Sequence, residues 1–508
     1  MHYFIAGSAP LARGRLLCGA LTGATPATER AKITRFDSFD GLLETAGRVL
    51  TIERHGRRHI ANLRRAGGER LDWTGELQRV PRFAADFPTA GLRTLLGRML
   101  GPRALLPGVS FTFERERYGL SAPNGKLLAE LLLERYASPR LTRHHGGDLV
   151  LLRLRGLRGY EKERDTLAAH LAREPDVEPL AVDLAVFLAE AAGGAPHPYV
   201  AKPAVTLEPT RPAAAGAAEV LAANFAVMRA NEWGIRAGVD VEFLHDFRVA
   251  MRRMRSVFMD FRNEFPPGEV AHFRTEFGWL NAVTGRPRDL DVMLDVMPAE
   301  LAAAGIAAPI AGAIATRLAD LRATAHAELL RELGGARYRR FVADWRRLLK
   351  RAAAASGGKP LAKRAAQAIT KRHRRIVEHP WRNDGSCTLE SLHELRKECK
   401  KLRYLVESFQ SIYAPKTIRR AVATLKGLQS AMGEAFDLHV QRTLLGELAG
   451  AAPGDPECAM LADALTALDA RLAGAEQRRL GTAAGALEDF RAASERRVYR
   501  ELLRATSS

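Results

Sequence analysis

The sequence predicts two domains, an α+β domain built on an antiparallel sheet followed by an all-α double helical bundle. Three observations lead to this division. Up to about residue 192, short segments of alternating polarity are separated by Gly, Pro and Asp. Residues 193–214 are rich in Pro and Ala. From residue 215 onward, apolar residues recur at intervals of three and four, which is the helical period.

The first domain, residues 1–192, is predicted to contain both strands and helices. Strand patterning covers four short stretches, at residues 33–39, 47–54, 59–64 and 109–116. Helical periodicity covers residues 90–100, 126–136 and, in pieces, 160–188.

The linker, residues 193–214, contains five prolines, and proline at this density supports neither a helix nor a central strand. The second domain, residues 215–508, is predicted to form two helical bundles, one from about residues 215–355 and one from about 360–508, with three to five helices in each. Breaks between helices are expected at residues 266–268, 356–360, 383–386 and 453–456.

An internal duplication relates the two bundles. Residues 245–261 and 393–409 align without a gap at an offset of 148 residues, and the segments that begin at Leu280 and Leu428 align at the same offset. Two separate segments in one register indicate a repeated unit. The bundles are therefore predicted to be related by a pseudo-twofold axis.

The repeated stretch carries two stripes when it is placed on a helix of about 100° per residue. One stripe is apolar and is expected to pack into a core. On a neighbouring face, a histidine is followed by basic residues three and four positions apart, over about three turns. The candidate binding residues on and beside these basic stripes are His245, Arg248, Arg252, Arg253, Arg255, His393, Arg396, Lys397, Lys400, Lys401 and Arg403.

The charge of the chain favours an acidic partner. Its net charge of +19 and its isoelectric point near 10.2 suit nucleic acid, anionic lipid or polyphosphate. A linear polyanion needs a row of cations near the spacing of its phosphates, and helix positions three and four apart have Cβ atoms about 5 to 6 Å apart. Two such rows would form a basic cleft or pore. Neither histidine has a neighbouring nucleophile or metal-ligand pattern, so no catalytic residue, metal or cofactor is expected.

Two other interpretations of the basic stripes stay open at this point. Charged runs on helices are usually solvated faces. Alternatively, Asp289 and Asp437, which occupy matching positions in the two copies, pair with some of the arginines as structural salt bridges. Five basic or histidine positions repeat in register, which is more than two aspartates neutralise, and this favours anion binding.

The chain is expected to be cytoplasmic, without a membrane partner. No run approaches eighteen apolar residues, and residues 1–10 lack the charged start and apolar core of a signal peptide. The four cysteines are far apart in the sequence, which is typical of reduced thiols and not of disulfides or a zinc site.

Both copies contain the pattern H-x2-R-x3-[RK][RK]-x-R, at His245–Arg255 and His393–Arg403, and the first copy is followed by RDLDV at Arg288–Val292. These motifs resemble those of the CHAD family, the conserved-histidine α-helical domains, over the whole second domain. The resemblance implies binding of inorganic polyphosphate by the motif residues and association with polyphosphate granules. Phe436 replaces Arg288 in the second copy, so the two halves need not bind equally.

The first domain is faintly similar to CYTH, the triphosphate-tunnel fold. Residues 33–43 and 49–65 are similar to that family's YFDTPD strand and to the paired strands that follow. Its metal-binding ExExK strand, however, has no counterpart in residues 1–19, and arginines occupy residues 149–159, where a later acidic strand is expected. Because a hard metal ion needs oxygen ligands, the resemblance implies a degenerate, non-catalytic domain.

Two competing functions follow from these features. One is a metal-dependent triphosphatase of the CYTH type, which the missing acidic strands disfavour. The other is binding of RNA or DNA, against which the basic stripe contains no aromatic residue to stack on bases. Inorganic polyphosphate is the predicted partner.

Overall fold

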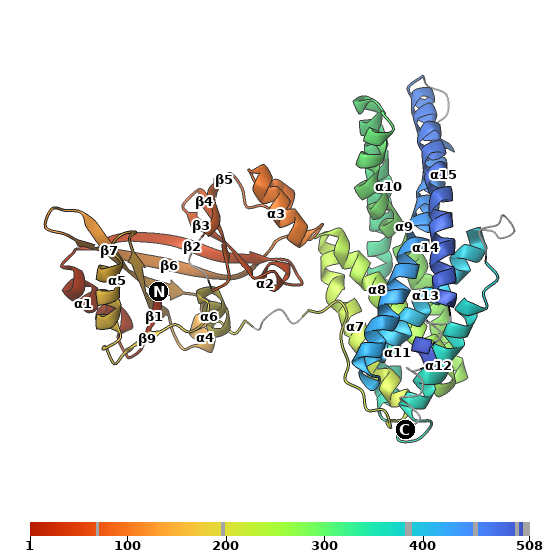
Figure 1. Cartoon of the computed structure of the whole chain (residues 1–508), viewed down its shortest axis with the longest axis horizontal. Helices are drawn as coiled ribbons and strands as arrows, with labels where there is room; N and C mark the ends of the chain where they lie inside the picture. Colours follow the sequence, from red (N-terminus) through yellow and green to blue (C-terminus); the bar gives the residue numbers. More distant parts are fainter. Residues whose placement is uncertain (68–70, 195–198, 382–388, 451–455, 493–496, 501–508) are drawn as a thin grey trace. The chain divides into compact units, whose positions relative to one another are not determined.

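The computed structural model describes residues 1–67, 71–194, 199–381, 389–450, 456–492 and 497–500 (Figure 1). The chain divides into two compact units, Met1–Tyr199 and Val200–Ser508. This division falls inside the predicted linker, of which residues 195–198 lie outside the described residues.

The N-terminal unit is built on one antiparallel sheet of nine strands in the order β5-β4-β3-β2-β6-β7-β8-β1-β9. The strands are β1 His2–Ile5, β2 Ala27–Asp37, β3 Arg48–His55, β4 Arg58–Arg65, β5 Leu71–Leu77, β6 Leu106–Ser121, β7 Leu127–Ala137, β8 Leu149–Gly156 and β9 Val177–Pro179. The α-helices are α1 Pro10–Thr22, α2 Leu42–Thr45, α3 Ala90–Leu100, α4 Pro139–His144, α5 Glu161–Leu171 and α6 Leu184–Ala191. The α+β class predicted for this unit is confirmed.

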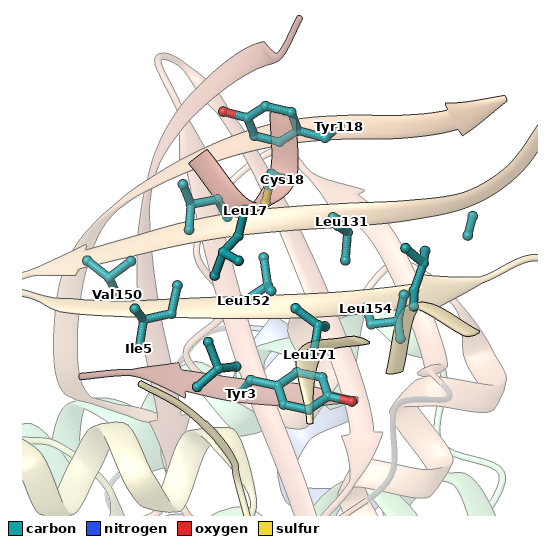
Figure 2. Packing of buried hydrophobic residues seen from close by; sticks show 14 residues of the cluster. Tyr3, Ile5, Leu17, Cys18, Tyr118, Leu131, Val150, Leu152, Leu154 and Leu171 are labelled. Atoms are coloured by element: carbon teal, nitrogen blue, oxygen red, sulfur yellow. The ribbon is translucent and has the colours of Figure 1, made fainter. Parts of the chain in front are cut away.

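One of the apolar cores of this unit lies between the sheet and helices α1 and α5 (Figure 2). Leu131 of β7 and Leu152 of β8 meet Leu17 of α1 and Leu171 of α5 there. Cys18 is fully buried in the same cluster, and burial raises the pKa of its thiol to about 12. A thiol in this environment is protonated and unreactive.

The helix predicted at residues 126–136 is wrong, because this segment forms the central strand β7. Its six residues Ala129–Glu134 are all buried. A strand that is covered on both faces loses the alternation of apolar and polar residues, so its sequence is hard to distinguish from a buried helix. The high helix propensity of Leu, Ala and Glu strengthened the wrong interpretation, and tertiary packing overrides that propensity.

The C-terminal unit is helical, as predicted. Its α-helices are α7 Ala213–Ala237, α8 Val241–Asp260, α9 Pro267–Ala303, α10 Ala308–Gly334, α11 Ala336–Ala353, α12 Leu361–Val377, α13 Leu389–Ser408, α14 Pro415–Gly450 and α15 Pro456–Arg491. The breaks predicted at residues 266–268 and 356–360 lie at the start of α9 and between α11 and α12. The break predicted at 383–386, and 453–455 of the break at 453–456, lie outside the described residues.

The helix bounds repeat at the offset found in the sequence. Helix α13 begins and ends 148 residues after α8, and α14 begins 148 residues after α9. The equivalent residues Phe261 and Phe409, at the ends of α8 and α13, stack with ring centroids 5.0 Å apart. The pseudo-twofold relation between the halves stays a prediction.

A buried ion-pair network ties three of these helices together. Arg372 of α12 donates hydrogen bonds to Asp260 of α8 at 2.9 Å and to Glu398 of α13 at 2.6 Å. Its side chain is 8% exposed and that of Asp260 is 5% exposed, so neither charge has bulk water as a substitute partner.

Of the helices that the structure describes, none combines the length and hydropathy that a membrane span requires.

We predict that Arg372→Met destabilises the helical unit by about 3–5 kcal/mol, because it leaves the Asp260 carboxylate buried without its partner. Thermal unfolding followed by circular dichroism at 222 nm measures this change. Arg374→Met is the matched control, since the exposed Arg374 pairs only loosely with Glu378, at 3.8 Å. Equal shifts of the two variants would contradict the role assigned to Arg372.

Candidate anion-binding site

Cations of both repeated stretches converge where α8 packs against α13. Burial, together with the neighbouring Arg396, Arg252 and Arg403, lowers the pKa of Lys400 to about 7. Arg252 also acts on Arg396, whose pKa is lowered by burial and by this like charge. Arg252 belongs to the first copy and the other three to the second. The two stripes therefore share one region of positive charge.

Arg248 extends this region on the α8 side. Burial, followed by repulsion from Arg252, lowers the pKa of Arg248 to about 10. We call the group Arg248, Arg252, Arg396, Lys400 and Arg403 the cross-helix cluster. Because like charges repel strongly where water is excluded, the cluster has a free-energy cost that a bound anion would remove.

Three donors of the cross-helix cluster lack acceptors. The Nε atoms of Arg248, Arg396 and Arg403 are shielded from solvent and have no hydrogen-bond partner in the part of the chain that the structure describes, although Glu407 forms an ion pair with the Nε atom of Arg403 at 3.7 Å. A buried N–H without an acceptor costs about 1–3 kcal/mol. Oxygen atoms of an anionic ligand would supply acceptors for these Nε donors.

Helix α9 holds Arg248 with neutral acceptors. Its Nη1 donates to Thr284 Oγ1 at 2.7 Å and to the carbonyl oxygen of Asn281 at 3.2 Å. The guanidinium group lies over Gly285, where a Cβ atom would be 3.6 Å from Nη1. Arg248 is therefore fixed in place while it keeps its full charge.

Helix α14 holds the equivalent Arg396 differently. Its Nη2 donates to the Asp437 carboxylate at 3.0 Å, and its guanidinium carbon lies 4.7 Å from the ring centroid of Phe436. Phe436 also stacks on His393, with centroids 4.4 Å apart. The salt bridge expected for Asp437 is thus present, whereas no ion pair or hydrogen bond of Asp289 with Arg248 is found among the described residues; Asp289 acts on Arg248 only through its charge.

The remaining predicted residues lie outside the cross-helix cluster. Arg253 is buried in an ion pair with Glu407 and lies over the ring of Tyr404. Lys397 donates to Glu394 at 2.6 Å and Lys401 donates to Glu398 at 2.8 Å.

Arg255 of α8 is half-buried, and no carboxylate of the described residues pairs with it. His245 lies beside Glu242 and Asp246, whose ligand atoms are within 4.8 Å of its own and of one another. The sequence interpretation missed this group, although His245 and Asp246 follow Glu242 by three and four positions on α8.

A second group of possible metal ligands lies in the N-terminal unit. Glu29 of β2 and Glu53 and His55 of β3 bring their ligand atoms within 4.8 Å of one another. Carboxylates are therefore present on neighbouring strands, although not in the segments where they were sought. They were missed because cross-strand register, and not spacing along the chain, brings them together.

These carboxylates already have basic partners. Glu29 lies 3.4 Å from His55, 3.8 Å from Arg115 and 4.0 Å from Arg117. Arg155, one of the arginines found where an acidic strand was expected, pairs with Glu130 at 3.1 Å. The charged side chains of this sheet thus pair largely with one another.

Comparison with known proteins identifies the helical unit. Residues 219–446 match the family model of the CHAD domain. The crystal structure of the CHAD domain from the plant Ricinus communis is 23% identical, covers 58% of this chain and 97% of that chain, and has a TM-score of 0.50. This likeness confirms the helical fold.

Two other solved structures are similar to this chain. PptA from Streptomyces chartreusis is 17% identical over 55% of this chain and 98% of its own, with a TM-score of 0.41. The putative adenylyl cyclase HpAC1 from Hippeastrum, described as having a dominant triphosphatase activity, is 14% identical over 39% of this chain and 98% of its own, with a TM-score of 0.29. No curated protein matches the chain.

We predict that Lys400 titrates near pH 7, charged below this value and neutral above it. Arg252→Gln raises its pKa, because the substitution removes a like charge that disfavours the protonated amine. Methylation of the lysines with ¹³C followed by NMR titration measures the shift, and the signal is assigned by its loss in Lys400→Arg. Arg274→Gln, which removes an exposed arginine of α9, serves as the control. A pKa of Lys400 near 10.5 would contradict the cross-helix cluster.

Proposed function

We propose that the helical unit binds inorganic polyphosphate through the cross-helix cluster. One observation carries this proposal: a lysine and arginines from two repeated helices gather in a largely buried region, where burial and the neighbouring arginines lower the pKa of Lys400 to about 7. A folded protein gathers like charges at a cost to its stability. An anion with many charges compensates that cost and supplies acceptors for the shielded Nε donors of Arg248, Arg396 and Arg403.

A linear polymer of phosphate suits this site better than a single small anion. The cationic positions follow the axes of α8 and α13 at intervals of three and four residues, with Cβ atoms about 5 to 6 Å apart. Successive phosphates of a chain can therefore contact successive side chains. Arg255, which has no paired carboxylate among the described residues, extends the row at the end of the α8 stripe. The CHAD domain adds support, since polyphosphate binding is what that family implies.

We also propose that the N-terminal unit is non-catalytic. We further propose that the protein associates with polyphosphate granules. A granule presents many chain segments, so a site that recognises the repeating phosphate can engage it anywhere along its surface. Nucleic acid is less suitable, because base stacking needs an open aromatic face. Phe436, the aromatic ring in contact with Arg396, already stacks on His393.

We predict that replacing Arg252, Arg255, Lys400 and Arg403 together with Ala weakens polyphosphate binding by two or more orders of magnitude. Calorimetric titration of the full chain with long-chain polyphosphate measures the affinity, and circular dichroism checks that the helices remain folded. In the wild type, the slope of log affinity against log salt should be about −0.7 for each phosphate contact, by analogy with single-stranded nucleic acid.

A control variant in which Arg339, Arg340, Arg346 and Arg347 of α11 are replaced with Ala removes the same number of charges from an exposed face. It should bind nearly as well as the wild type. Equal loss in the two variants would reduce the site to general surface charge. Single-stranded RNA at equal phosphate concentration is the competitor, and equal competition would favour the nucleic-acid alternative.

A second candidate function, a metal-dependent triphosphatase, is favoured only by the group Glu29, Glu53 and His55. We predict no phosphate release from tripolyphosphate with Mg²⁺ or Mn²⁺, since Arg115 and Arg117 lie within 4.0 Å of Glu29 and repel a metal ion there. Release above the background, lost in Glu29→Gln, would establish the enzyme instead.

A further inference from the structure

We propose that Phe436 and Asp437 restrain the second repeat, so that the first repeat binds a phosphate chain more strongly and the second contributes only after Asp437 is displaced. This inference rests on the proposed function and concerns which repeat binds the phosphate chain more strongly. It follows from comparing equivalent contacts at the offset of 148 residues.

The two equivalent arginines differ in what holds them. Arg248 donates to a hydroxyl and a carbonyl oxygen, at 2.7 and 3.2 Å, and neither acceptor carries a charge. At the position of Thr284 the second repeat has Met432, which has no hydroxyl group. Arg396 turns instead to the Asp437 carboxylate at 3.0 Å. Its charge is therefore partly compensated before any ligand arrives.

The residue before each aspartate differs as well. In the first repeat, Arg288 lies 3.6 Å from Glu242 at the start of α8. In the second repeat, Phe436 replaces this arginine, and the position equivalent to Glu242 is Glu390. The second repeat therefore has one cation fewer at this place.

The ring of Phe436 also contacts two motif residues of the second repeat, His393 and Arg396. It stacks on His393 at 4.4 Å and has the Arg396 guanidinium at 4.7 Å. The Nδ1 atom of His393 is shielded from solvent without a hydrogen-bond partner among the described residues. Both motif residues are thus held against an apolar ring, and a phosphate must compete with that ring and with Asp437.

The restraint is of a kind that a ligand can release. The Asp437 side chain is 57% exposed, whereas that of Arg396 is 14% exposed. The carboxylate can therefore rotate into water at little cost, while Arg396 stays in place. An ion pair with an exposed partner contributes about 1 kcal/mol at most, so it lowers affinity moderately and does not abolish binding.

The test is the affinity of the full chain for long-chain polyphosphate with Asp437→Asn. The measurement is made at pH 6.0, below the pKa of about 7 of Lys400, because loss of the Asp437 charge lowers that pKa further. We expect binding to become about three- to fivefold tighter. We also expect the slope of log affinity against log salt to become steeper by about 0.7, because one more cation is available to the chain.

Glu328→Gln is the matched control. Glu328 pairs with Arg331 on α10, so this substitution changes the net charge by the same amount without touching α13 or α14. It should leave both the affinity and the salt slope unchanged. If Glu328→Gln tightens binding as much as Asp437→Asn does, the effect is one of net charge and the proposal is overturned.

A second variant tests the aromatic half of the restraint. Phe436→Arg restores the residue of the first repeat, and we expect it to pair with Glu390 as Arg288 pairs with Glu242, to release His393 and to tighten binding further in the presence of Asp437→Asn. Unchanged affinity and salt slope in both Asp437→Asn and the double variant would overturn the proposal. If the wild type does not bind polyphosphate at all, the proposed function itself fails, and the two failures are thereby distinguished.

Discussion

Burial of the apolar faces of α8 and α13 is the constraint that holds like charges close together in the helical unit. Each helix has an apolar face that is fully buried, with Met251 and Phe258 on one and Leu395 and Leu402 on the other. Burying such side chains contributes about 1.5–3 kcal/mol each. This packing holds the backbone firmly enough that Arg252 and Lys400 cannot separate to relieve their repulsion. A loosely packed pair of helices would simply move apart.

The counterions are placed so that they stabilise the helices without neutralising the site. Asp260 and Glu398 hold Arg372, and Glu407 holds Arg253, in ion pairs that are largely buried. Within the cross-helix cluster, Asp437 accepts a hydrogen bond from Arg396, and Glu407 lies 3.7 Å from the Nε atom of Arg403. This distribution separates cations that serve the fold from cations that are available to a ligand, although all of them lie on the same short stretches of sequence.

Much of this arrangement can be predicted from the sequence, and its limits have physical causes. The repeat and the amphipathic period place α8 and α13 correctly, because burial of an apolar face determines the rotation of a helix. Spacing along one helix does not show which cations find a carboxylate on another, so Arg253, which pairs with Glu407 of α13, could not be separated from Arg252. The partner of Lys401, Glu398, lies three positions before it on the same helix, and this pair could have been recognised from the sequence. For a similar reason, the contact between Glu29 and His55 could not be predicted from spacing, because the two residues lie on neighbouring strands. Strand β7 was misassigned because burial on both faces removes the polar half of its pattern.

The stacked rings of Phe261 and Phe409 bring equivalent residues of the two repeats into contact. Contact between equivalent residues is typical of an isologous interface, such as that of a homodimer. In a homodimer, every substitution occurs twice, so a change that weakens one half weakens both. Covalent fusion of the two copies removes this constraint. Residues such as Met432 and Phe436 can then be acquired in one copy while Thr284 and Arg288 persist in the other, and a formerly equal pair can divide its work.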